Sequence, residues 1–480
     1  MNARPPASGA TASRRGLLLV LLVAQLMVIL DISAVNVALP DLAEDLSIGG
    51  GDIAWTITSY SLVFGSLLLL GGRAADLLGR RRVFLAGLAV FTLSSLASAL
   101  ALSATSLFVA RAGQGLGAAL LSPAALSIIS TVFQGNERAK ALGAWGAVGG
   151  TGAAIGVLLG GVLTDVADWR AIFYINLPVG LALALAAAKV VPADRESAKW
   201  RGLDVRGAVV VTASLAAIVY AISQASSAGW ASAQTLGVGL AGLAGLGGFA
   251  VLERHTTQPL LRMERLADRA VGGGFLLMLV ASAVLFGMFL LSSLYLQNAL
   301  GAGPLETGLG FLPVALAAGA GAHLGSHLVR HAGVRAPMAG AFALTAVGML
   351  LLARVGDDGS YAGDVLPGML IAGLGLGVVL VSVAVAVLTG AREDEAGMLS
   401  GLNTTGHEIG GSFGVALLVT IATVAAPTAS HSAIAGGIAD AFLAAAALAG
   451  AGSVIAVIAL PPATTFLPKL RLTPESMPIH

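Results

Sequence analysis

The chain has 480 residues, of which 57% are hydrophobic and only 11% are charged, and its mean hydropathy is +0.90. Because so few charged side chains cannot cover a water-soluble protein of this size, the composition predicts a membrane protein. The net charge of +1 favours neither a nucleic-acid partner nor a polybasic lipid switch, and a chain without cysteine has no disulfide, iron–sulfur cluster or thiol nucleophile.

Long apolar runs alternate with short stretches of charged and turn-forming residues along the chain. About 20 apolar residues cross the hydrocarbon core as one helix, so each run is an expected membrane span. The first run continues past Asp31 to Pro40 and is too long for the apolar core of a cleavable signal peptide. We count fourteen spans, at approximately 17–40, 52–71, 83–101, 105–132, 139–163, 169–190, 205–223, 234–252, 270–299, 306–328, 336–354, 365–389, 396–425 and 436–460.

The Lys and Arg residues support this count, because such residues concentrate in cytoplasmic loops. With a cytoplasmic N-terminus, nearly all of them fall in inward-facing segments, and the exceptions are Arg111, Arg170 and Arg354. One miscounted helix near the start would destroy this separation. We therefore predict an all-α membrane protein with both termini in the cytoplasm. Ala and Gly are abundant and Arg greatly outnumbers Lys, a composition typical of bacteria with a high GC content. We therefore predict that the protein lies in a bacterial cell (inner) membrane.

The first expected span contains an acid, Asp31, in the sequence LDISAVNVALP of residues 30–40. A carboxylate inside a bilayer is costly and is by default a functional candidate. It can be neutral in one conformation and ionised in another, as a proton carrier must be. The alternative is a structural acid that stays paired with a neighbour.

Between the second and third spans, residues 71–82 read GGRAADLLGRRR. We predict a tight hairpin turn at the cytoplasmic membrane surface, because Gly permits the turn and the arginines mark the inner side. The carboxylate of Asp76 suits a helix N-terminus. The alternative is a topology anchor that any polytopic protein could carry.

The fourth span contains a cation, Arg111, in LFVARAGQGLGAAL of residues 107–120, with Gln114 on the same helix face. Asp31 and Arg111 lie about 14 and 9 Å from the outer helix ends at 1.5 Å per residue. The two can therefore occupy a similar depth, and we predict that they couple proton binding through competition for charge. The alternative is that Arg111 only organises packing through carbonyl contacts.

Two further regions carry candidate residues. In the fifth span, Gly152, Gly156 and Gly160 repeat every four residues beside Gly161, which allows another helix to approach closely. In the thirteenth span, Glu408 is a candidate second protonatable or cation-attracting site, the alternative being a buried, hydrogen-bonded acid. Polar residues predicted to line a substrate cavity are Gln25, Asn36, Tyr60, Gln114, Tyr295, Asn298, Asn403 and His407.

The sequence gives little support for a metal site, for ATP binding or for enzymatic activity. His323, His327 and His331 have a helical spacing that could bind a metal, but no carboxylate or cysteine accompanies them, so we predict no metal. The sequence has no Walker loop for ATP, and no pairing of nucleophile and base. We therefore predict neither a cofactor nor an enzyme.

Several of these motifs resemble those of the major facilitator superfamily. Residues 71–82 are similar to its G-x-L-A-D-R-x-G-R-R loop, and residues 30–40 to its L-D-x-x-x-V-N-V-A-L-P signature. Residues 111–119 resemble its R-x-x-Q-G-x-G-A-A motif. The helix-5 motif G-P-x-x-G-G is matched except at Val157, where proline is usual. Residues of the loop motif that match are Gly72, Asp76, Gly79, Arg80 and Arg81, whereas Ala74 and Leu77 depart from it.

The resemblance implies an organisation in two halves. Residues 17–190 and 270–460 would form two six-helix halves, and 191–269 would hold two inserted helices between cytoplasmic tails at 1–16 and 461–480. WRAIFYINLPVG, at 169–180, closely resembles the drug:proton antiporter branch with fourteen helices. In the family the 71–82 loop is a cytoplasmic gate, in which the aspartate caps a neighbouring helix and the arginines lock the halves together.

The function implied by the resemblance is proton-coupled export of small amphipathic or cationic compounds, as in multidrug or antibiotic efflux. The halves would rock about a midplane cavity, and protons entering from outside would neutralise Asp31 and release the substrate. An uptake symporter, which Val157 keeps open, and a non-transporting sensor or scaffold are the alternatives. The expected partners are a small-molecule substrate, protons and lipid, without nucleic acid, and the expected assembly is a monomer.

Overall fold

The computed structural model describes residues 8–48, 55–194, 204–256, 259–356, 359–391, 395–425 and 431–471. Within these ranges all regular structure is helical. Eleven of the described helices are long and apolar enough to cross a membrane, and 155–166 and 206–222 are shorter apolar stretches. The protein is thus an all-helical, multi-pass membrane protein.

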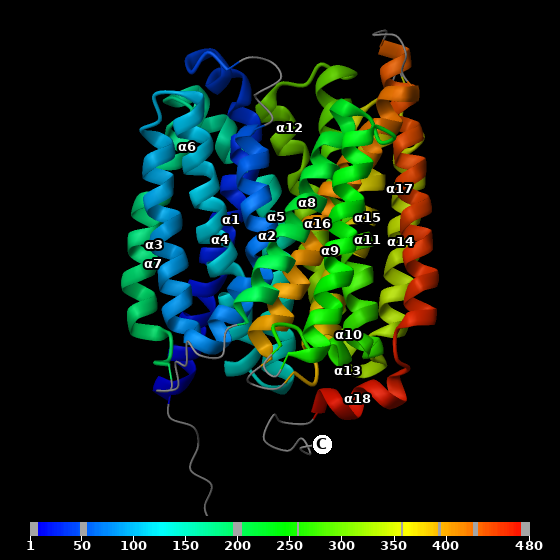
Figure 1. Ribbon diagram of the computed structural model, residues 1–480. Coiled ribbons are helices and arrows are strands. Elements are labelled where there is room, and N and C mark those ends of the chain that lie inside the picture. Colours follow the sequence, from blue (N-terminus) through cyan, green and yellow to red (C-terminus); the bar gives the residue numbers. More distant parts are fainter. Residues whose placement is uncertain are drawn as a thin grey trace, which may run out of the picture.

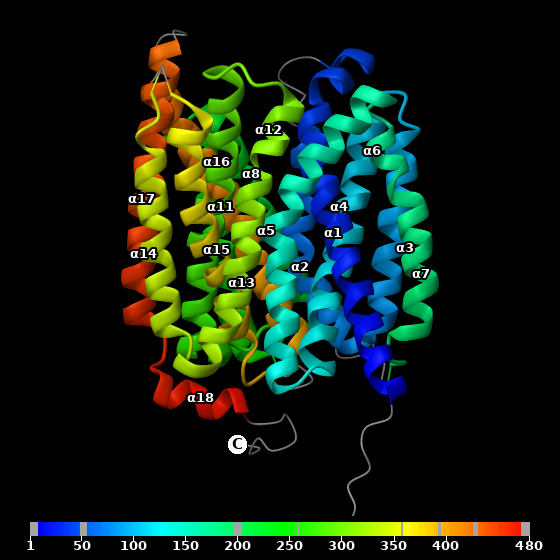
Figure 2. The same ribbon diagram turned by 180° about the vertical axis from the view of Figure 1, so that it is seen from behind.

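The helices form one bundle with two groups of elements (Figure 1 and Figure 2). The first group is α1 (Ser8–Asp45), α2 (Trp55–Leu78), α3 (Arg80–Ala99), α4 (Ala104–Val132), α5 (Gly135–Val166), α6 (Ala171–Tyr174) and α7 (Asn176–Val190). The second is α11 (Arg269–Asn298), α12 (Pro304–Gly310), α13 (Leu312–Ala332), α14 (Arg335–Leu352), a π-helical turn (Tyr361–Val365), α15 (Leu366–Leu388), α16 (Ala396–Ala425) and α17 (His431–Ala459).

Two pairs of helices, α2 with α16 and α5 with α13, make the main contacts across the seam between the groups. Helices α8 (Val205–Ala228) and α9 (Ala233–His255) pack on each other, and α8 also packs on both α2 and α16. Helix α9 is peripheral, since only 17% of its apolar 18-residue segment is buried inside the protein, against 78% of the corresponding segment of α4. Helix α8 therefore lies beside the seam, along α2 and α16 (Figure 1).

The predicted hairpin at 71–82 is wrong in its extent. Helix α2 continues to Leu78 and α3 begins at Arg80, so that Gly79 alone makes the turn, with φ of 102°. Only glycine adopts such a φ without strain. The last turns of α2 stay helical because Gly71 and Gly72 pack directly against the backbones of α4 and α16.

Other boundaries differ in smaller ways. The expected spans at 169–190 and 306–328 are each interrupted, between α6 and α7 and at Phe311 between α12 and α13. Pro313 lies in the first turn of α13, where the missing N–H of proline removes no helical hydrogen bond. Two short helices were not predicted: α10 (Met263–Ala267) and α18 (Ala463–Arg471), which lies across the end of the bundle (Figure 1).

Candidate functional site

Asp31 lies in a closed network of hydrogen-bond donors. Its Oδ2 accepts from Arg111 Nη1 at 2.5 Å, and its Oδ1 accepts from Gln114 Nε2 at 2.8 Å and Asn176 Nδ2 at 2.9 Å. The side chains of Asp31 and Arg111 are 0% and 1% exposed. Because all three partners donate, this arrangement fits the ionised carboxylate. The acid and the cation that the sequence placed at similar depth are in direct contact.

Arg111 also organises the packing around this pair. Its Nε donates to the carbonyl of Thr56 at 3.2 Å, and its guanidinium lies over the ring of Tyr60, 4.5 Å from the centroid. It contacts Gln114 Oε1 at 2.9 Å as well. Arg111 therefore contacts both a backbone carbonyl and the carboxylate, and its guanidinium joins α4 to α1 and α2.

Sequence reasoning missed Asn176 and two serines of α3. Ser95 Oγ accepts from Gln114 Nε2 at 2.8 Å and from Asn176 Nδ2 at 3.3 Å, and Ser98 Oγ donates to Gln114 Oε1 at 3.0 Å. The signal for Asn176 was present, because an amide at the start of an apolar run needs a buried partner. Its partner could not be read from the sequence, since it is 145 residues away.

The glycines of α5 bring that helix against α1 just where α1 carries Asp31. A Cβ atom on Gly156 would lie 2.7 Å from Ser33 Cβ, and one on Gly160 would lie 2.7 Å from the Cα of Ala34. A Cβ on Gly152 would lie 2.8 Å from Ile29 Cγ2, and Gly161 is buried beside them. The helix runs unbroken through Val157.

Replacing Gly160 by valine is expected to destabilise the protein by about 1–3 kcal/mol, the usual cost of overpacking a tight contact. It should also disturb the surroundings of Asp31, because Ala34 is three residues away. Thermal unfolding in detergent measures the stability. Gly149→Val is the matched control, since nothing lies within 4 Å of a Cβ at that position of the same helix. Equal losses in the two variants would contradict the contact argument.

Asp76 connects the two groups of helices at the end of the bundle where α2 ends and α16 begins. Its Oδ1 accepts from the backbone N–H of Gly397 at 2.9 Å, and its Oδ2 from that of Met398 at 3.0 Å. These are orphan N–H groups at the start of α16, so the carboxylate of α2 caps a helix of the other group. The side chain is 1% exposed. Gly72 packs alongside it on the carbonyl of Gly397.

The neighbouring arginines bond mainly within the first group. Arg80 pairs with Asp76 at 3.4 Å. The backbone N–H groups of Arg81 and Arg82 both donate to Asp194 at 3.0 Å, and Arg81 Nη2 donates to the carbonyl of Ala188 at 2.5 Å. Asp194 therefore caps α3 as Asp76 caps α16. A cross-seam arginine contact comes instead from α5, where Arg138 donates to the carbonyl of Leu388.

Glu408 lies on α16 and faces α2, with its Cβ 3.9 Å from the position a Cβ would take on Gly65. It is close enough to act electrostatically on Tyr60. Within the described residues, no hydrogen bond joins it to Asp31 or Arg111. His407 points elsewhere, toward Ser282 Oγ at 2.6 Å, as expected for adjacent residues of a helix.

The described residues among those predicted to line a cavity bond to different neighbours. Gln25 accepts from Ser122 Oγ at 2.8 Å, and Tyr60 and Gln114 belong to the surroundings of Asp31. Tyr295 is buried, and its hydroxyl donates to the carbonyl of Gly356 at 2.7 Å, so it holds a loop. Asn403 is buried, with its Oδ1 unbonded in the described part of the chain. The side chains of Asn36 and Asn298 lie outside the described residues.

The three histidines of α13 do not gather into a metal site. His331 Nδ1 lies 2.9 Å from the carbonyl of His327, one turn earlier on the same helix. Among the residues that the structure describes, no group of three His, Asp or Glu side chains could hold a metal ion.

Comparison with known proteins places this architecture in a family. The Major Facilitator Superfamily profile matches residues 21–415. The puromycin resistance protein pur8 of Streptomyces alboniger is 41% identical over 420 residues, which cover 86% of this chain and 83% of that protein. The cephamycin export protein CmcT of Amycolatopsis lactamdurans is 37% identical over 462 residues, or 95% and 93% of the two chains.

The fold is shared with proteins of far lower sequence similarity. The proton:xylose symporter XylE is superposed with a TM-score of 0.68 at 14% identity, over 96% of this chain and 98% of that one. At such identity the likeness concerns the fold alone. Together, the profile, the two relatives and the helical architecture show that the chain belongs to the Major Facilitator Superfamily.

Proposed function

We propose that the protein is a proton-coupled exporter of small amphipathic or cationic compounds, including antibiotics, that works by alternating access. Relatives named for antibiotic resistance and export, 41% and 37% identical over most of the chain, support the substrate class. The observation that carries proton coupling is the buried pair of Asp31 and Arg111, in which the carboxylate of α1 accepts from donors on α4 and α7. A transporter of this family has no need of catalytic residues, so we propose no enzymatic activity.

The geometry suggests how a proton would act. In the ionised state Asp31 holds Arg111, Gln114 and Asn176 together. Protonation would remove the negative charge and leave a buried guanidinium without its counter-ion, a strongly unfavourable state. The network would then rearrange, and the halves would move. One proton falling through 100 mV supplies about 2.3 kcal/mol, which is roughly a 50-fold substrate gradient at 1.4 kcal/mol per factor of ten.

We further propose fourteen crossings and two cytoplasmic termini in a bacterial inner membrane. The eleven candidate spans include α6 with α7 as one crossing and α12 with α13 as another. Helices α5, α8 and α16 have 32, 24 and 30 residues, more than the roughly 20 that a crossing needs. These would give two six-helix halves at 17–190 and 270–460 around an inserted pair, in a protein that works as a monomer.

In this proposal Asp76, with Gly72, Gly79, Arg80 and Arg81, forms the cytoplasmic gate. The cap that Asp76 places on α16 supports the role, because it joins the halves directly. Glu408 is proposed as a second protonatable site, supported by its place on α16 opposite α2 and near Tyr60.

A direct test uses inverted membrane vesicles energised so that their interior is acidic. Adding puromycin or a fluorescent lipophilic cation should release protons from vesicles that contain the protein and leave empty vesicles unchanged. Growth of a drug-sensitive bacterium expressing the chain should show raised resistance to the same compounds. The second candidate, an uptake symporter, is favoured by Val157 in place of the usual proline. It predicts greater drug sensitivity and no proton release, and either result would overturn the exporter.

A further inference from the structure

A pair of acids, Asp204 and Glu253, lies where α8 begins and α9 ends, and the proposed function does not use it. Glu253 is 3% exposed, and its Oε2 accepts from the backbone N–H of Leu261 at 2.9 Å. Asp204 caps α8, and its Oδ1 accepts from the backbone N–H of Gly207 at 3.0 Å. Each carboxyl group therefore has one oxygen bonded to the backbone.

The two remaining oxygens of these acids lie close together. Gly207 has no side chain, and a Cβ atom there would lie 2.6 Å from both Asp204 Oδ2 and Glu253 Oε1. Both oxygens are buried, and no donor among the described residues reaches either of them. If both acids were ionised, two negative charges would repel each other, and two buried acceptors would stay unpaired.

The charged groups nearby do not neutralise this pair. Arg262 and Arg265, at α10, both pair with Glu395, which stands just before α16. The other charged side chains of these segments are exposed, and they are Arg206, Arg254, His255 and Glu264. Among the described residues, Asp204 is therefore the titratable group that faces Glu253.

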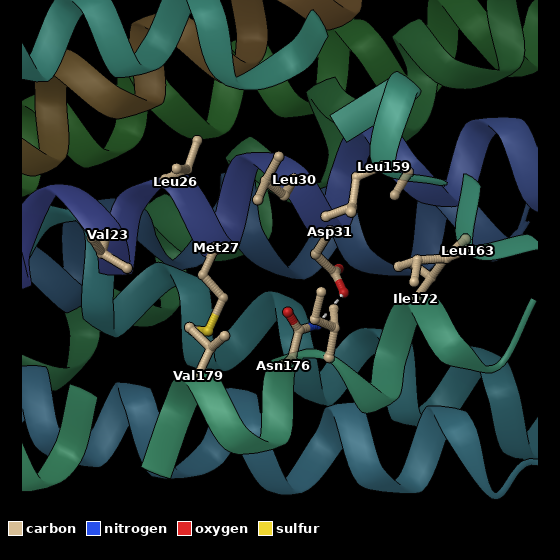
Figure 3. Close-up of a pocket in the computed structure, with 12 residues that line it drawn as sticks. Val23, Leu26, Met27, Leu30, Asp31, Leu159, Leu163, Ile172, Asn176 and Val179 are labelled. Atoms are coloured by element: carbon tan, nitrogen blue, oxygen red, sulfur yellow. Dashed lines mark hydrogen bonds between the residues drawn. The ribbon is translucent and has the colours of Figure 1, made fainter. Parts of the chain in front are cut away.

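This environment is the reverse of that around Asp31. There the carboxylate oxygens are met by N–H donors, and Figure 3 shows one of them, Asn176, directed at Asp31. Such a set of donors fits an ionised acid. Between Asp204 and Glu253 the missing donor is supplied when one carboxyl group is protonated, because its O–H then donates to the other.

We propose that Asp204 and Glu253 share one proton, and that this proton holds the adjoining ends of α8 and α9 together. Two carboxyl groups that share a proton hold it more tightly than an exposed acid does. The pair therefore keeps its proton at a pH at which a free glutamate is ionised. As the pH rises further, the proton passes to the solvent and leaves two buried negative charges side by side. The contact is thus firm at low pH and broken at high pH.

The same contact continues to α16. Glu253 bonds the N–H of Leu261, and the next residue, Arg262, pairs with Glu395 at 2.9 Å. This segment lies at the same end of the bundle as α18 (Figure 1). Asp76 caps α16 just beyond Glu395. Loss of the shared proton would release the segment and loosen α16 at the proposed cytoplasmic gate, a consequence that rests on the proposed function.

The test is cysteine labelling of the full, otherwise cysteine-free chain in nanodiscs, which leave both membrane faces open. Leu260→Cys places a reporter at a residue that is 4% exposed, next to the pair. Ala267→Cys places a reference at an exposed residue of α10. The ratio of their maleimide labelling rates cancels the general rise of thiol reactivity with pH. We expect this ratio to rise severalfold from about pH 6 to about pH 9, as the pair loses its proton.

Two amide variants separate the proton from the rest of the contact. Glu253→Gln and Asp204→Asn should each keep the ratio low at every pH. The amide N–H of either variant donates where the shared proton did, and its oxygen still accepts from the backbone. Glu264→Gln is the matched control, because Glu264 is an exposed acid of α10, and it should retain the wild-type rise.

A flat ratio in the wild-type chain would overturn the shared proton, and so would a rise that survives in both amide variants. The profile should be the same in sodium and in choline buffers that contain a chelator. A ratio that follows metal-ion concentration at fixed pH would show a bound cation in place of the proton, and would also overturn the proposal. Labelling needs neither substrate nor gradient. A pH-dependent ratio without export would contradict only the exporter, and export with a flat ratio would contradict only the shared proton.

Discussion

Asp31→Asn is expected to abolish proton-driven export while the protein still inserts into the membrane. Asparagine cannot bind and release a proton at this position, and it leaves the guanidinium of Arg111 buried without a counter-charge. Removing one partner of a buried ion pair typically costs about 3–5 kcal/mol, so a loss of thermal stability should accompany the loss of flux. Drug-induced proton release from inverted vesicles and unfolding in detergent measure the two effects.

A double variant separates folding from transport. Asp31→Asn combined with Arg111→Gln removes both charges, so stability should recover although export should not. Asp41→Asn provides the control, because Asp41 is an exposed acid of the same helix. Full flux through a folded Asp31→Asn protein would contradict proton coupling at this residue. If the wild-type chain also lacks flux, a sensor or scaffold becomes the better description.

Asp76→Ala is expected to open the end of the seam that we propose faces the cytoplasm. The change leaves the N–H groups of Gly397 and Met398 without their acceptor, and losing a helix cap costs about 0.5–2 kcal/mol. A cost near 1.4 kcal/mol shifts the closed-to-open equilibrium about tenfold. Because the chain has no cysteine, Ser326→Cys introduces a single reporter. Ser326 is 4% exposed and faces Gly143 across the seam.

A membrane-impermeant maleimide, added to inverted vesicles, should label this cysteine about tenfold faster in Asp76→Ala, and export should fall. Asp194→Ala is the matched control. Asp194 accepts two backbone N–H groups in the same way, but it caps α3 within its own group of helices. Its loss should leave the labelling rate unchanged. Similar labelling rates in the two variants would show that general loosening, rather than the contact between α2 and α16, controls access.

The sequence predicted those features that depend on residues close together in the chain. Apolar runs gave the helices, because a bilayer requires every backbone group to be bonded within its own segment. Asp31 and Arg111 stood out because charges are costly at that depth, and counting residues from the helix ends placed them at compatible heights. The family resemblance placed Asp76 at the N-terminus of a neighbouring helix, and its negative charge suits that position.

What the sequence could not provide depends on contacts between distant segments. Asn176 appeared to be part of an ordinary apolar span, since nothing local shows that its amide faces Asp31. Tyr295 appeared suited to a cavity, but its hydroxyl bonds to a loop carbonyl 61 residues away. The length of α2 was underestimated because Gly71 and Gly72 suggest a turn when read alone. Their helical conformation follows from close packing on α4 and α16.

Helix α8 touches both α2 and α16, and this double contact constrains any motion of one helix group against the other. If α2 and α16 move relative to each other, α8 cannot move as a rigid body with both of them. Its contact with one of the two helices must therefore slide. Sliding between packed helices is easiest where side chains are small, and Gly65 of α2 presents such a spot to Val219 of α8. Helices α8 and α9 would thus stay in contact with both groups on that side, and would exclude lipid tails from the seam while one group moves against the other.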